Sequence, residues 1–457
     1  MQYIGLLGSV ALLIGLALRG VNIVLASLLC SLLVIVTNGL PLATGITDYY
    51  SFGPLGAFTF AGKFFLLFAA GAVFGRIMGE SHAAASIAMV LIKHLGAHRA
   101  LWITVLACTL LTYGGVVVFV VIFAIYPLGL KLLQEADIPK RLFCAALALG
   151  SGTFTLTALP GTPSIHNVIA AVALGTDLFA GFWIGLVGAV LMFAIGMWYL
   201  ERQRLLAASR AEHFRPGLND RISSVDARDY PGWVSACLPL AAVLLTIILP
   251  RLLMLVLPQS VQSGDSALAG LLHFADSQPI VWPSIALVGG SLLAALLFGS
   301  LRGKVLQVAG DGTQDSIMPL INTAAVIGFG GVVTHTEGFS QFTGMMLESA
   351  LPPLFSMFAS VSLVAAITGS ASGGLQIFMQ TMAPAYLAMG IEPQVLHRLA
   401  TMASGGFDSL PHCGAIVAML TITGLTHREA YRDVGIITVV IPAGVTLLMI
   451  VLVGLFG

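Results

Sequence analysis

The sequence has 457 residues, of which 58% are hydrophobic and 9% are charged, and its 20 basic and 20 acidic side chains cancel in charge. Because a soluble protein of this size carries about a quarter charged residues, this composition excludes a soluble globular protein, and we expect no nucleic-acid partner. Apolar runs of bilayer-crossing length recur from Val21–Val36 to Ile436–Phe456. They predict an all-α polytopic membrane protein, since about 20 apolar residues cross the hydrocarbon core.

In chain order, we predict five full spans before a charged central stretch and five after it. The first five lie near residues 3–18, 21–38, 58–75, 142–175 and 178–199, and the second five near 233–250, 281–299, 316–335, 399–425 and 436–456. Between the third and fourth span of each half lies a Gly-interrupted apolar segment, near 101–128 and near 355–389. Each segment is too long for one span and too short for two, which predicts a re-entrant hairpin of two half-helices.

The charged stretch at residues 201–232 predicts a solvated linker between an N-terminal unit, 1–200, and a C-terminal unit, 233–457. In this topology 17 of the 20 basic residues fall on the linker side, Arg251 and Arg398 fall on the other side, and Lys63 lies inside a span. The positive-inside rule then places the linker in the cytoplasm and both termini outside, in an inner-membrane protein. With five spans each, the two units insert in opposite orientations.

Two short segments, one in each unit, resemble each other. The stretch "ALGSGTFTLTALPGT" (Ala148–Thr162) lines up with "TMASGGFDSLPHCG" (Thr401–Gly414), and both contain Ser-Gly-x-Phe and Leu-Pro. Each follows a Gly-rich tip, "TYGGV" or "TGSASGG", and each precedes a last span. Inverted repeats with discontinuous helices are typical of secondary transporters, whose substrate site lies where the repeats meet. Chance similarity is the alternative, and the matched order of tip, broken helix and final span argues against it.

Pro160 and Pro163 remove backbone donors inside the fourth span and predict an unwound break over about residues 151–167, and "GGFDSLPHCG" predicts a second break over about 404–414. Such backbone survives at membrane depth only inside protein or beside a water-filled cavity, and the N-termini of half-helices attract anions. The alternative is that these residues only kink or pack helices. The residues of both tips and both breaks that we expect to bind a carboxylate and hydroxyl groups are Thr112, Tyr113, Gly114, Thr157, Gly161, Thr162, Ser164, His166, Asn167, Ser370, Ser372, Gly373, Ser409 and His412.

The chain resembles the gluconate permease (GntP) family of the ion transporter superfamily over essentially its whole length. The resemblance rests on the order of apolar hairpin, "ALPGTPSIHN" break and charged linker, and on "TGSASGGLQI" and "FDSLPHCGAIVAMLTITGLTHREAYRDV". It implies proton-coupled symport of a small organic anion, by a transport domain that moves against a scaffold, and it leaves a homodimer open.

The resemblance also bears on the substrate. The first tip here is Leu111–Gly114, where sugar-acid members hold an acidic Phe-Phe-Glu-like stretch. The motif "LPHCGA" looks closer to the members associated with 3-hydroxybutyrate and other short monocarboxylates. The resemblance therefore implies a smaller, less hydroxylated substrate than gluconate, with a gluconate or sugar-acid symporter as the alternative.

Asp408 lies inside a predicted span beside the second break, where a carboxylate is costly and is functional by default. Loss of water favours its protonated form, which suits a proton carrier in symport. His412 and His166 are further proton-coupling and hydrogen-bonding candidates, because histidine titrates near neutral pH. The alternatives for Asp408 are a helix cap or a permanent pair with Lys63. His335 and Glu337 are interpreted as a solvated external helix end, with a gate as the alternative.

Other classes of function lack a signature in this sequence. It contains no P-loop, HExxH, CxxC or dinucleotide motif in a credible context, which argues against an ATP-driven pump or an enzyme. The five scattered cysteines predict no disulfide framework, and we expect no cofactor and no metal site. Sodium in place of protons stays open, because unwound carbonyls and hydroxyls bind hard cations. An organic-anion channel with the same half-helices is the remaining rival.

Overall fold

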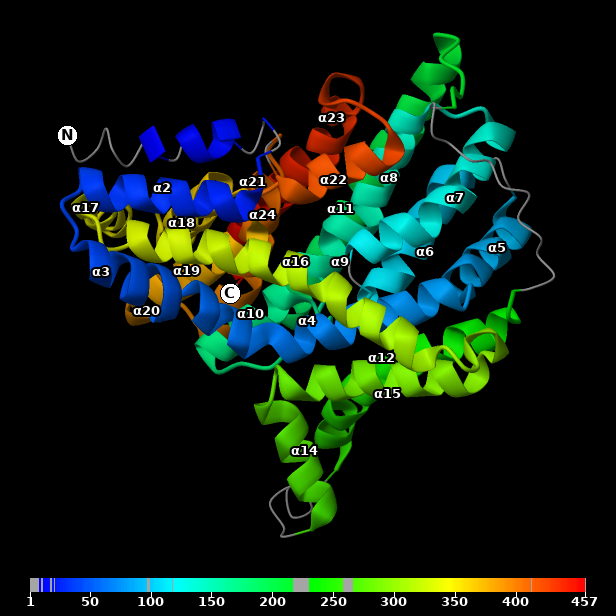
Figure 1. Ribbon diagram of the computed structural model, residues 1–457, viewed down its shortest axis with the longest axis horizontal. Coiled ribbons are helices and arrows are strands. Elements are labelled where there is room, and N and C mark those ends of the chain that lie inside the picture. Colours follow the sequence, from blue (N-terminus) through cyan, green and yellow to red (C-terminus); the bar gives the residue numbers. More distant parts are fainter. Residues whose placement is uncertain are drawn as a thin grey trace.

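The computed structural model describes residues 8–9, 11–16, 19, 21–96, 99–116, 118–216, 230–257, 266–411 and 413–456. Part of the predicted first span, part of the predicted linker and the candidate residue His412 lie outside these ranges. The described chain is helical and contains no β-strand (Figure 1).

The helices before the linker are α2 (Ile23–Thr37), α3 (Leu42–Thr44), the π-helix η1 (Gly45–Phe52), α4 (Ala57–Glu80), α5 (Ala83–Leu95), α6 (Ala100–Tyr113), α7 (Val118–Ala136), α8 (Lys140–Gly152), α9 (Phe154–Thr157), α10 (Ile165–Leu174) and α11 (Phe182–Ser209). Those after it are α12 (Trp233–Val256), α14 (Ala267–Ser277), α15 (Val281–Leu297), η4 (Gly299–Leu301), α16 (Val305–Val333), α17 (Glu337–Leu347), α18 (Pro353–Thr368), α19 (Ala371–Thr381), α20 (Ala383–Ala388), α21 (Pro393–Phe407), α22 (Gly414–Thr423), α23 (His427–Gly435), η5 (Ile436–Val440) and α24 (Ile441–Phe456).

Helices long and apolar enough to cross a bilayer are fewer than the ten predicted spans. Among the described residues they are Leu42–Glu80, Phe182–Ser209, Trp233–Met254, Val305–Val333 and His427–Leu455. A sixth candidate is the pair α14 and α15, which is bent by 105° (Figure 1). The predicted fourth and ninth spans are each divided into shorter helices. Helices α8, α9 and α10 lie where the fourth span was predicted, and α21 and α22 lie where the ninth was predicted.

The helix α16 begins at Val305, well before the start predicted at residue 316. Its first turns are polar, so hydropathy alone underestimated its length. In these turns Arg76 of α4 lies 3.1 Å from a carboxylate oxygen of Asp315 and 3.8 Å from one of Asp311. These partly exposed ion pairs join the polar end of α16 to α4 and contribute at most about 1 kcal/mol each.

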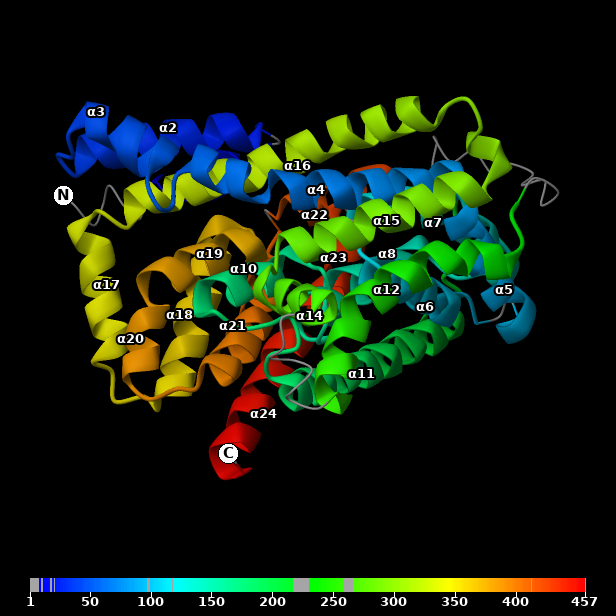
Figure 2. The same cartoon turned by 90° about the horizontal axis from the view of Figure 1, so that it is seen from below.

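Helices α4 and α16 lie side by side, with α2 against α16 (Figures 1 and 2). Glycines permit this close approach, as in other membrane helix pairs. A Cβ atom added at Gly312 would lie 2.8 Å from the Cα atom of Val73. On the other face of α16, the Ser27 hydroxyl of α2 donates to the Ala325 carbonyl at 2.5 Å. These helices, with α12 and α15, form one packed group.

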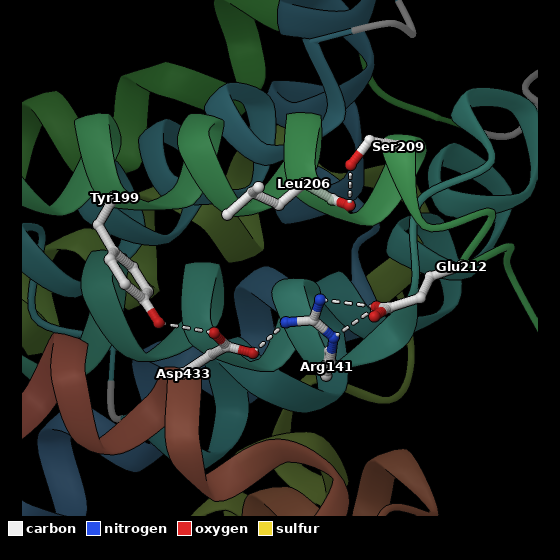
Figure 3. Close-up of polar contacts among 6 residues, drawn as sticks. All are labelled: Arg141, Tyr199, Leu206, Ser209, Glu212 and Asp433. Atoms are coloured by element: carbon white, nitrogen blue, oxygen red, sulfur yellow. Dashed lines mark hydrogen bonds and ion pairs between the residues drawn. The ribbon is translucent and has the colours of Figure 1, made fainter.

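A charged network ties the two halves of the chain together (Figure 3). Arg141 of α8 donates to Glu212, which follows α11, at 2.7 Å, and to the buried Asp433 of α23. The Tyr199 hydroxyl of α11 donates to the other Asp433 oxygen at 2.7 Å. Because Asp433 has a guanidinium and a hydroxyl partner, its burial is compensated, and α8, α11 and α23 are joined at one end.

The elements around the two short helices α10 and α22 follow a similar order. Helix α10 follows α6, α7, α8 and α9, whereas α22 follows α18, α19, α20 and the kinked α21, and each has ten residues. Each ends at a glycine in the left-handed conformation, Gly175 with φ +64° and Gly424 with φ +66°. A left-handed residue at this position commonly terminates a helix, and glycine adopts it without steric cost.

We expect Gly312→Leu to destabilise the protein by about 1–3 kcal/mol, because the added side chain collides with the α4 backbone. Gly310→Leu is the matched control, since Gly310 lies on the same helix but is exposed, with no atom within 4 Å of an added Cβ. Thermal unfolding of the purified variants in detergent measures the difference. Equal melting temperatures for both variants would contradict the tight α4–α16 contact.

Candidate functional site

The first hairpin tip lies directly against the first break. Helix α6 ends at Tyr113, and the chain turns through Gly115, whose φ is +94°. The Tyr113 hydroxyl donates to the Pro160 carbonyl at 2.9 Å. A Cβ atom added at Gly115 would lie 3.3 Å from Cγ of Pro163. The tip therefore satisfies one of the carbonyl groups that the break frees.

The first break itself covers residues 158–164, between α9 and α10. Ser164 caps α10, because its hydroxyl oxygen accepts from the Asn167 N–H at 3.3 Å and its hydroxyl donates to the Leu156 carbonyl at 2.6 Å. Thr162 is fully buried, and Gly161 adopts φ +77°. The N-terminus of α10 thus opens onto a buried, non-helical segment, which favours a negative charge.

The Asn167 side chain hydrogen-bonds the break to the loop after α10 and to α21. Its side-chain amide donates to the carbonyls of Thr162 and Leu178, both at 2.9 Å. Its oxygen lies 2.8 Å from Nε2 of His397 on α21, and the other ring nitrogen of His397 lies 2.7 Å from the Thr176 hydroxyl. The predicted ligand Asn167 is therefore occupied by protein partners, and it positions the break against α21.

The second break meets the first. Helix α21 is kinked at Gly405, whose φ and ψ are −91° and 31°, and it ends at Phe407. A Cβ atom added at Gly405 would lie 2.5 Å from Cγ2 of Thr157. Only glycine lets the kink of α21 approach the end of α9 this closely. Thr157 and the start of the second break are thus neighbours.

The second hairpin tip carries a capped helix N-terminus. Helix α18 ends at Thr368, before Gly369, and Ser370 caps α19 by accepting from the Gly373 N–H at 3.2 Å. The hydroxyls of Ser370 and Ser372 lie 3.3 Å apart. Helix α19 also packs on α10 (Figure 2). The two tips and the two breaks are therefore linked to one another.

Asp408 lies where the second break meets the second tip. Its carboxylate accepts from the Ser409 hydroxyl at 3.2 Å and faces the Ala371 N–H in the first turn of α19. The side chain is partly exposed. The positive end of the α19 dipole therefore stabilises the ionised form of Asp408.

Buried polar atoms without a hydrogen-bond partner gather in this region. Nine such side-chain atoms occur among the described residues, and four of them belong to the first tip, the first break, the start of α10 and α21. These four are Thr112 Oγ1, Thr162 Oγ1, His166 Nδ1 and Arg398 Nη1. Because leaving a buried polar group unpaired is costly, such a cluster is suited to binding a small polar ligand.

Helix α21 begins at Pro393, before the start predicted at residue 399, so Arg398 lies within this helix rather than in front of it. Its side chain is fully buried, beside the fully buried His397. A signal was available, since Pro393 is favoured in the first turn of a helix and predicts that α21 begins before residue 399. Arg398 and His397 are polar residues of this region to which the sequence assigned no role in the site.

The structure also locates Lys63, His335 and Glu337. Lys63 is exposed on α4, with its amine 5.9 Å from the centre of the Phe64 ring. Among the ion pairs of the described residues none joins it to Asp408, which excludes a permanent pair in this structure. His335 and Glu337 are exposed between α16 and α17, and the His335 ring stacks on Tyr49 with centroids 3.6 Å apart. Their surroundings are those of a helix end.

Comparison with known proteins shows that this chain is similar to transporters. A family model described as GntP family permease matches residues 1–455. An uncharacterized transporter of Bacillus subtilis, YxjC, is 35% identical and covers 97% of both chains. An uncharacterized transporter of Haemophilus influenzae is 25% identical over 76% of this chain and 74% of its own.

Two solved structures share the fold. The YdaH transporter of Alcanivorax borkumensis aligns over 87% of this chain and 88% of its own, with a TM-score of 0.54 and 18% identity. MtrF of Neisseria gonorrhoeae, described as one of a class of antimetabolite efflux pumps, aligns over 90% of this chain and 85% of its own, with a TM-score of 0.56 and 13% identity. At these identities the likeness concerns the fold alone.

We expect Gly405→Ala to lower stability by about 1–3 kcal/mol, because its Cβ would collide with Thr157. Gly406→Ala is the matched control, since the nearest atom to an added Cβ there lies at an ordinary 3.7 Å. Thr157→Ser removes the colliding methyl group and should restore much of the loss in the double variant. Thermal unfolding of the four proteins completes a double-mutant cycle, and purely additive effects would refute the contact between the breaks.

Proposed function

Because this chain belongs to the GntP family of permeases, and so to the secondary transporters rather than the enzymes, we propose that it imports a small hydroxy-carboxylate with protons. The substrate class is that of 3-hydroxybutyrate and related short acids. The observation that supports this most directly is the cluster of unpartnered buried groups at the first break, Thr112, Thr162 and His166. They lie beside the α10 N-terminus, which favours an anion.

In this proposal the substrate carboxylate occupies the first break, and its hydroxyl group reaches the hydroxyls of the tips. Thr162 and Thr112 each supply a hydroxyl that can donate to a carboxylate oxygen. Hydroxyl donors and a helix N-terminus bind an anion without a fixed lysine, which fits the exposed position of Lys63.

Asp408 is the proposed proton carrier. In its ionised form the carboxylate is stabilised by the α19 N-terminus and by Ser409. When the substrate brings a second negative charge into this low-dielectric region, protonation of Asp408 removes the repulsion. Substrate binding and proton binding therefore favour each other, which is the requirement for symport.

Access alternates, in this proposal, by movement of the two hairpins and two broken helices against the group built on α4 and α16. The packing of α4, α12, α15 and α16 on one another supports a scaffold of this kind. The repeated order of elements supports two units, 1–200 and 233–457, inserted in opposite orientations with a cytoplasmic linker and external termini. We propose the inner membrane as its location, with the orientation that the distribution of basic residues favours.

The function is tested in proteoliposomes with an imposed pH or sodium gradient. We expect accumulation of 3-hydroxybutyrate driven by an inward proton gradient and not by sodium. Uptake that ignores both gradients and shows no counterflow would identify a channel instead. A thermal-shift screen of short hydroxy acids, keto acids and sugar acids defines the substrate, and stabilisation by gluconate-like acids alone would overturn the preference for short acids.

We expect Asp408→Asn to abolish accumulation driven by the pH gradient while some exchange of internal for external substrate remains. The neutral amide cannot release a proton, yet it still fills the space beside α19. Glu348→Gln is the matched control, because Glu348 is an exposed carboxylate at the end of α17. Proton-driven accumulation that survives in the Asp408 variant would exclude this residue as the carrier.

A further inference from the structure

Arg398 is a buried cation that has no role in the proposed function. Its side chain is fully buried on α21. Its Nε atom donates to the Ala180 carbonyl at 3.0 Å, and Nη2 donates to the carbonyls of Ala180 at 2.8 Å and Leu178 at 3.2 Å. The remaining nitrogen, Nη1, is buried and has no partner. Neutral carbonyls thus hold one side of the guanidinium, and the other side is free to bind.

No carboxylate of the described residues lies within 4 Å of this guanidinium. The acidic side chain that acts on it most is Asp177, which is engaged by Arg251 at 2.8 Å, and Asp276 lies 3.7 Å from the same Arg251 nitrogen. The other groups that face it are the Tyr113 hydroxyl and the adjacent His397. A buried charge without a counterion is costly inside a membrane protein and marks a functional site.

The guanidinium is joined to the first break through a single shared atom. The Leu178 carbonyl accepts from the Gly161 N–H at 2.9 Å, from the Asn167 amide at 2.9 Å and from Arg398. Glycine at residue 185 makes room for the Arg398 side chain, since a Cβ there would lie 2.8 Å from its Cδ and 2.3 Å from the Ala158 carbonyl oxygen. Arg398 therefore lies beside the segment that carries the unpartnered Thr162 and His166.

We propose that Arg398 supplies the fixed positive charge that binds the substrate carboxylate in the first break, through Nη1. This inference rests on the proposed function. A guanidinium-to-carboxylate hydrogen bond is charge-assisted and stronger than one between neutral groups. The Nε and Nη2 atoms keep the loop after α10 in place, so the same residue positions the loop and binds the ligand. The site then selects ionised acids over uncharged analogues of the same shape.

The test compares three acids with their amides on purified protein: 3-hydroxybutyrate, lactate and gluconate against 3-hydroxybutyramide, lactamide and gluconamide. Thermal shifts at increasing concentration give the relative affinities. We expect the wild-type protein to prefer acid over amide, and Arg398→Gln to lower the affinity for the acid at least tenfold, so that the preference falls toward one.

Arg302→Gln is the matched control. Arg302 is an exposed arginine after η4 and belongs to neither tip and neither break, so this variant should keep the wild-type acid preference. If Arg398→Gln does not fold, Arg398→Lys replaces it. The lysine keeps the charge but lacks the planar fork, and we expect it to weaken acid binding tenfold or more.

The outcomes separate the two proposals. A wild-type protein that none of the three acids stabilises contradicts the proposed function. A wild-type protein that responds to an acid, with Arg398→Gln responding equally and with the same preference, contradicts the role of Arg398 alone. Unchanged acid affinity in a folded Arg398→Lys variant would also overturn it.

Discussion

Backbone groups that leave a helix at membrane depth must find partners inside the protein, and this constraint organises the molecule. Hydrocarbon offers no hydrogen bonds, and carbonyl and N–H groups of the first break accordingly bond to other parts of the chain. Tyr113 reaches Pro160, and Asn167 and Gly161 both reach Leu178. The hairpin tip, the break and the returning loop are therefore parts of one polar unit that the surrounding apolar helices enclose.

The same constraint bears on which partners the buried charged side chains have. At the end near the linker, Arg141 and Asp433 are paired and further bonded to Glu212 and Tyr199, which compensates their burial (Figure 3). At the breaks, the cation Arg398 and the carboxylate Asp408 are held by backbone dipoles rather than by each other. Charges held in this way remain available to a ligand or a proton, whereas a closed ion pair does not.

Much of the helical pattern could be predicted from residue order. The apolar runs predicted α2, α12, α15 and α24 within a few residues, and Pro160 with Pro163 located the first interruption, because a proline removes a donor whatever its surroundings. The start of α16 was predicted too late, since its first turns are polar and hydropathy does not detect them. The helix α14 and the short α17 were not predicted at all, and the first span lies partly outside the described residues.

The sequence by itself determined that the chain lies in a membrane, where its helices break, and which hydroxyls and carboxylate accompany the breaks, because these depend on local composition and backbone chemistry. Only the tertiary structure decided which of those groups are occupied and which are free. In the folded protein Asn167 bonds the break to its neighbours, Thr162 Oγ1 has no partner and the Arg398 side chain is fully buried. Those outcomes depend on contacts between residues more than 200 positions apart, such as Asn167 with His397, and no local pattern records them.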